Sequence, residues 1–141
     1  MNREHKFDLW HAYEQTKFHV HGCKPQLCIR IGSHHEQLDE MLHDHRCDTW
    51  SYITASNPAS ELLSDVQNAG RNRDLEALLK SQNLVFCRGE GIGSDPTWPA
   101  ETSFLILGIS REAAMQLGRQ FGQNAIVCGS LGHPAELVDC R

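Results

Sequence analysis

The spacing of apolar and polar residues predicts short strands and helices along the 141 residues. Leu27, Ile29 and Ile31 alternate with polar residues, which places them on one face of a strand. The segment 17–21 also has extended character, and a turn over residues 22–26 separates it from that strand. The pattern therefore predicts a β-hairpin.

Helical spacing appears in four places. Residues 5–16 form a short amphipathic segment with Phe7, Trp10 and Tyr13 on one face. Two further helices are predicted to start in capping boxes, at Ser33 with Glu36 and at Ser64 with Gln67, and a fourth at a Ser110 cap. The first of these three has the buried stripe Leu38, Met41, Leu42 and His45, the second runs to about Lys80, and the third ends at Gly122.

Further strands are predicted over residues 48–54, 83–87, 102–109, 125–128 and 136–138, with a long loop over 88–99. Helices and strands alternate irregularly, which predicts an α+β fold with a mixed, largely antiparallel sheet and helices packed mainly on one face. We expect one domain over 1–141, with an N-terminal arm or short helix over 1–15 and an α+β core over 16–141.

Composition narrows the possible functions. The net charge is −5 and no run of Lys or Arg occurs, so nucleic acid is not an expected partner. No segment has the apolar length of a signal peptide or membrane span, so we expect a cytoplasmic protein without membrane association. Its six cysteines are then interpreted as reduced thiols or metal ligands before disulfides.

The clearest candidate site follows the strand that ends in Ile53-Thr54-Ala55-Ser56-Asn57-Pro58, where the chain must turn. Extending the apolar stripe Leu75, Leu78 and Leu79 backwards reaches Asn68 and Arg71, which should face this turn. The predicted ligand-binding residues are Thr54, Asn57, Asn68, Arg71, Glu101, Ser103, Gln123 and Asn124. Arginine and amides suit a phosphate, a carboxylate or a base edge, and Glu101 could hold a hydroxyl or act as a general base. Alternatively, these side chains satisfy backbone groups of the turn, and Glu101 pairs with Arg71.

Two His-X-His-X-Cys segments form a second candidate. His19, His21 and Cys23 make one copy, and His43, His45 and Cys47 make the other. Such residues could bind zinc, although exposed histidines give the same pattern. The glycine-rich segment 89–93 lacks the lysine and the following helix of a phosphate-binding loop, so a flexible lid or an ordinary hairpin loop fits it better.

Four segments together resemble a bacterial family catalogued as domain of unknown function 3293. They are the turn 53–58, Asn68 and Arg71 with the following leucines, residues 98–104, and residues 118–125. The likeness spans about residues 12 to 138. The family pattern has paired glutamates after the tryptophan, whereas this chain has Ala100 followed by Glu101. The resemblance implies an architecture but no activity.

Three functions remain open from the sequence. The first is binding of a small polar ligand, of nucleotide or phosphometabolite type, in a pocket at the end of the 53–58 strand. The second is a protein-interaction or inhibitory factor in a bacterial or phage defence setting. The third is a hydrolase or transferase that uses Glu101 with Arg71.

Overall fold

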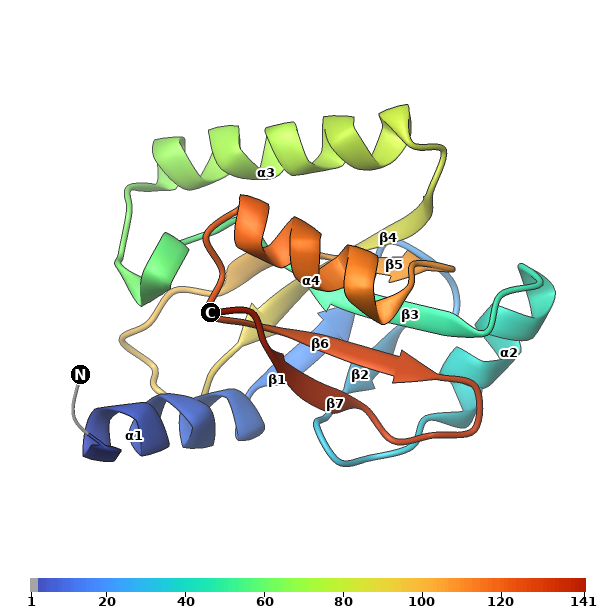
Figure 1. The fold of residues 1–141 in the computed structure, drawn as a ribbon, viewed down its shortest axis with the longest axis horizontal. Helices are drawn as coiled ribbons and strands as arrows, with labels where there is room; N and C mark the ends of the chain where they lie inside the picture. Colours follow the sequence, from blue (N-terminus) through green and yellow to red (C-terminus); the bar gives the residue numbers. More distant parts are fainter. Residues whose placement is uncertain (1–2) are drawn as a thin grey trace.

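One curled, half-barrel sheet organises the molecule, and four helices pack against it (Figure 1). The computed structural model describes residues 3–141, with side chains from residue 9 onward. The described strands are β1 (Lys17–Val20), β2 (Leu27–Ile29), β3 (Thr49–Ile53), β4 (Val85–Ile92), β5 (Glu101–Leu107), β6 (Ala125–Ser130) and β7 (Glu136–Asp139). The helices are α1 (Arg3–Glu14), α2 (Glu36–Asp44), α3 (Asp65–Ser81) and α4 (Arg111–Gln120), with a 3₁₀ turn η1 at Pro58–Ser60.

The strand order is β2-β1-β4-β5-β3-β6-β7, and each neighbouring pair is antiparallel. This confirms the predicted α+β fold with a largely antiparallel sheet. The hairpin of β1 and β2 is also confirmed, with Phe18 opposite Ile29. Strand β7 is the predicted terminal edge strand.

Alternation along the strands divides the core between two faces of the sheet. On the face that we call the α3/α4 face, Ile53, Phe104 and Ile106 pack with leucines of α3 and α4. On the opposite face, the α1/α2 face, Trp50 and Tyr52 join the buried residues of α2. The expectation that helices lie mainly on one face therefore holds for α3 and α4 only, because α2 and α1 pack on the other (Figure 1).

Several predicted helix ends are confirmed. Ser64 and Gln67 form a full capping box at the start of α3, and the Ser110 side chain accepts a hydrogen bond from the Ala113 amide at the start of α4. Gly122 follows α4 with a φ of 70°, a left-handed conformation that suits glycine. The predicted Ser33 cap is wrong, because α2 begins after His35 without a side-chain cap.

The predicted loop over residues 88–99 is shorter than expected. Strand β4 continues to Ile92, and its glycines pair with both β1 and β5. A Cβ atom on Gly89 would lie 1.9 Å from the His19 carbonyl oxygen and 2.8 Å from the Tyr52 hydroxyl. Glycine is therefore needed here for β1 to approach β4.

The expectation that all six cysteines are thiols or metal ligands is wrong for two of them. Cys23, in the turn after β1, forms a disulfide with Cys87 of β4. Cys28, Cys47, Cys128 and Cys140 are free. The two bonded residues are 64 positions apart, so this bond joins the hairpin turn to the middle of the sheet.

Candidate functional site

The turn after β3 is held by side chains from the first half of α3. The backbone N–H of Asn57 donates to Asn68 Oδ1 at 2.9 Å, and the side-chain Nδ2 of Asn68 donates to Asn57 Oδ1 at 2.8 Å. Arg71 Nε donates to the Ala55 carbonyl at 2.6 Å, and its Nη2 donates to the Phe121 carbonyl at the end of α4. The helical phase of α3 therefore brings both predicted residues to the turn, where their contacts are with the chain itself.

Asn72 completes this network, although the sequence reasoning missed it. Its Oδ1 accepts from the Ala55 amide at 2.9 Å, and its Nδ2 donates to Ser56 Oγ at 2.9 Å. Asn72 is almost fully buried. The signal was present in the sequence, because Asn72 precedes Leu75 by three residues and Leu79 by seven, on the same helical stripe.

Polar residues continue the apolar rows on the α1/α2 face. On β5, Glu101 and Ser103 follow the alternation of Leu105, and on β3 Thr54 follows Tyr52. Glu101 and Ser103 lie opposite Gly91 and Gly89 of β4. Because glycines have no side chain to cover this part of the sheet, space is left above it.

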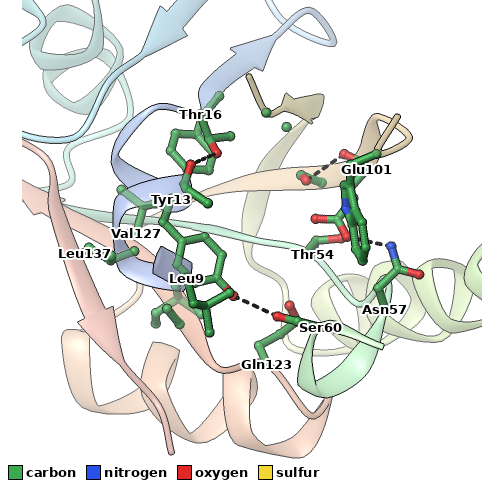
Figure 2. A pocket seen from close by; sticks show the side chains of 18 of the residues that line it. Leu9, Tyr13, Thr16, Thr54, Asn57, Ser60, Glu101, Gln123, Val127 and Leu137 are labelled. Carbon is green, nitrogen blue, oxygen red and sulfur yellow. Dashed lines mark hydrogen bonds between the residues drawn. The ribbon is translucent and has the colours of Figure 1, made fainter. Parts of the chain in front are cut away.

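This space is a cavity of about 590 Å³ between the sheet and α1, which we call the α1 cavity. Helix α1 contributes Leu9, Ala12 and Tyr13 to its wall. Apolar lining from the sheet comes from Phe18, Tyr52, Ile126, Val127 and Leu137, and Trp98 lines it from the loop before β5. Figure 2 shows Tyr13 directed towards Ser60, whose hydroxyl is 3.4 Å away, with Glu101 and Asn57 on another side of the cavity.

Glu101 is the most buried of the carboxyl groups that line this cavity, since Glu61 and Asp95 are exposed. Its Oε2 accepts from Asn57 Nδ2 at 2.7 Å, and Trp98 lines the same cavity. Burial raises the pKa of Glu101 above its ordinary value, and the polar side-chain groups of Asn57 and Trp98 oppose part of that rise. Burial also raises the pKa of the Tyr13 and Tyr52 hydroxyls, so both remain protonated at neutral pH.

The predicted ligand-binding residues fall into two groups. Thr54, Asn57, Glu101, Ser103 and Gln123 line the α1 cavity. Asn68, Arg71 and Asn124 do not, and each has a partner within the chain: Asn124 Nδ2 donates to Ser60 Oγ at 3.0 Å.

The lining residues are also partly bonded to the chain itself. Gln123 Nε2 donates to the Ser56 carbonyl at 3.0 Å and Thr54 Oγ1 to the Thr102 carbonyl at 2.6 Å. No hydrogen bond or ion pair of the described residues joins Arg71 to Glu101. The Glu101–Arg71 pair expected in the structural alternative is therefore absent from the described contacts. Of the two residues in the hydrolase or transferase hypothesis, Glu101 lines the cavity and Arg71 does not.

The two predicted zinc sites are not supported. Among the side chains that the structure describes, from residue 9 onward, no group of three or more His, Cys, Asp or Glu residues is placed to hold a metal ion. In the first set, His19, His21 and Cys23, the cysteine forms a disulfide with Cys87 and has no thiol to bind a metal ion. In the second set, His43, His45 and Cys47 surround the end of α2, and His45 is exposed and not part of the buried stripe as predicted.

The fold and the cavity define a small antiparallel α+β protein with a preformed pocket beneath its N-terminal helix. A family model described as "Protein of unknown function (DUF3293)" matches residues 53–126, just over half of the chain. The protein therefore belongs to this family, as the resemblance implied. The matched range includes the turn, α3 and Glu101, whereas α1, which closes the cavity, precedes it.

Neither the curated proteins nor the solved structures include a match to this chain. In the part of the chain that is described, no helix has the length and apolarity needed to cross a membrane.

Proposed function

We propose that this protein binds a small, non-phosphorylated molecule in the α1 cavity. The observation that carries the proposal is the cavity itself: about 590 Å³, with apolar and aromatic walls and a few polar groups at one end. Small-molecule sites typically have volumes of roughly 300–1,000 Å³ and this kind of lining. The cavity lies at the end of β3, where Tyr52 and Thr54 line it.

The charges around the cavity favour a ligand without phosphate over a nucleotide or phosphometabolite. Glu61, Asp95 and Glu101 line it, and no described lining residue is Lys or Arg. Arg71, the expected phosphate ligand, donates to two backbone carbonyl oxygens. A phosphate would therefore meet carboxylates without a compensating cation, which is unfavourable in a partly buried site.

The network around the turn supports a binding role because it makes the polar end rigid. Asn57 is held by Asn68 and by Glu101, and it also accepts from the Leu63 amide at 2.9 Å. A ligand would then meet groups that are already oriented, which reduces the entropy lost on binding.

The test uses a variant that fills the cavity. A Cβ atom on Gly91 would lie 3.8 Å from the Phe18 ring and from Ser103 Oγ, both ordinary contacts, so Gly91→Leu should place its side chain in the cavity without displacing the backbone. Glu90→Leu is the matched control, because Glu90 is the neighbouring residue of β4, is exposed and points to the opposite face.

Thermal unfolding of the three proteins would be measured with a panel of metabolites at millimolar concentration. We expect at least one non-phosphorylated compound to raise the Tm of the wild type and of Glu90→Leu but not of Gly91→Leu. The proposal is refuted if no compound stabilises the wild type, or if stabilisation is the same in Gly91→Leu.

A further inference from the structure

The aromatic and acidic lining of the α1 cavity points to the charge of its ligand. We propose that this ligand is an organic cation, an ammonium group carried on an apolar body, with the ammonium group placed at Glu101. This inference rests on the proposed function and specifies which molecules the cavity selects.

The acidic groups of the cavity come from separate parts of the chain. Glu61 follows η1, Asp95 belongs to the loop after β4, and Glu101 begins β5, so three separate segments direct carboxyl-bearing residues to one cavity. The described lining contains no Lys or Arg. The resulting field attracts a cation and repels an anion, and low-polarity walls strengthen that preference.

Aromatic rings from four segments also line the cavity. Tyr13, Phe18, Tyr52 and Trp98 line the same cavity from α1, β1, β3 and the loop before β5. Phe18 and Tyr52 form an edge-to-face pair with ring centres 5.3 Å apart. The electron-rich faces of aromatic rings attract ammonium groups, and cages of such rings recognise alkylated ammonium ions.

Glu101 has no positively charged partner among the described residues. The side chain that donates a hydrogen bond to it, Asn57, is neutral, and no ion pair among the described residues includes Glu101. An ionised carboxyl group that is partly buried without a cation is destabilised. A ligand ammonium group would supply the missing positive charge, whereas a neutral ligand of the same shape would not.

The experiment compares probes that share one body and differ in the charge of the head group. The probes are 2-phenylethylamine, which is cationic, 2-phenylethanol, which is neutral, and 3-phenylpropanoate, which is anionic. Affinity would be measured by calorimetry at mildly alkaline pH. Intrinsic tryptophan fluorescence, to which Trp98 at the cavity contributes together with Trp10 and Trp50, gives a second signal. The proteins are the wild type, Glu101→Gln, Gly91→Leu and the control Glu90→Leu.

We expect the amine to bind the wild type about tenfold more tightly than the alcohol, since a charge-assisted hydrogen bond is stronger than a neutral one by about that factor. Glu101→Gln keeps an oxygen for Asn57 to bond but loses the charge, so it should weaken the amine about tenfold and leave the alcohol unchanged. Gly91→Leu should abolish binding of both, and Glu90→Leu should alter neither.

Two results would overturn the inference, and they differ in what they say of the cavity. Equal affinity for amine and alcohol, lost in Gly91→Leu, rejects the cation and leaves the proposed function standing. Absence of amine binding to the wild type also rejects the cation, and the metabolite panel then decides separately whether the cavity binds anything.

Discussion

Asn72 provides the sharpest test of how the turn beneath the α1 cavity is held. Its side chain is 5% exposed and makes hydrogen bonds to the Ala55 amide, Ser56 Oγ and the Asn68 carbonyl, at 2.9, 2.9 and 3.1 Å. The substitution Asn72→Ala removes all three. Ala55 is fully buried, so water cannot replace the lost acceptor at its amide.

The expected destabilisation follows from these contacts. A buried donor left without a partner costs about 1–3 kcal/mol, and the lost side-chain volume adds about 1 kcal/mol. Alanine is the better helix former by about 0.5 kcal/mol, which offsets only part of this loss. We therefore expect Asn72→Ala to lower the free energy of unfolding by about 1.5–3.5 kcal/mol.

Urea denaturation measures this loss, with Arg73→Ala as the control because Arg73 is the exposed neighbour on α3. The control should change the free energy by no more than about 0.5 kcal/mol. In thermal unfolding, the Asn72 variant should melt roughly 5–12 °C below the wild type. If Asn72→Ala is as stable as Arg73→Ala, the turn does not depend on this residue and the described network is not what holds it.

Three further predictions concern the sheet and Glu101. In urea denaturation, Gly89→Ala should lower the free energy of unfolding by about 3 kcal/mol or more, because its Cβ would collide with a β1 carbonyl. The control Gly91→Ala should be nearly neutral. Equal effects of the two substitutions would contradict the described strand contact. Unreduced, denatured protein should show four free thiols, and reduction of Cys23–Cys87 should expose two more and cost about 2–4 kcal/mol; six thiols without reductant would contradict the disulfide. Burial raises the pKa of Glu101 in the folded state. The difference from the unfolded-state pKa therefore stabilises the fold fully below the ordinary glutamate pKa, and this stabilisation is lost as pH rises through the raised pKa. The Tm of Glu101→Gln should therefore increase relative to the wild type over that pH range, and a constant difference would contradict the shift.

The ligand charge can also be checked through pH. An ammonium ligand requires the Glu101 carboxylate, so its affinity should increase as pH rises through the pKa of that group, which burial raises. Among the described residues, the other titratable groups that line the cavity are Glu61, Asp95, Tyr13 and Tyr52, and the charge of Arg141 acts on Tyr13. The same titration of Glu101→Gln reports their contribution, and an identical pH dependence in both proteins would assign the effect to them.

Two of the site predictions show where reasoning along a helix works and where it stops. Helical phase correctly directed Asn68 and Arg71 to the turn after β3, since positions three and four residues apart share one face. It could not show that Arg71 donates to the Phe121 carbonyl, because that oxygen belongs to α4, 50 positions along the chain. The expected phosphate ligand is therefore a structural residue.

The glycines of β4 illustrate a different limit. Glycine disfavours strands, so residues 89–93 were predicted to form a loop. In the sheet, pairing on both sides with β1 and β5 outweighs that local preference, and the missing side chains make room for the approach of β1 at Gly89 and for the cavity at Gly91.

The sequence by itself determined the β1–β2 hairpin, the caps at Ser64 and Ser110, the α+β class and the polar turn after β3. These features follow from local hydrogen bonds and from alternation, which depend on residues only a few positions apart. Only the tertiary structure decided that Cys23 meets Cys87, that the histidine segments form no metal site among the described residues, and that α1 and Glu101 line the same cavity. These features depend on which strands become neighbours and how far the sheet curls, and both are set by packing across the whole chain.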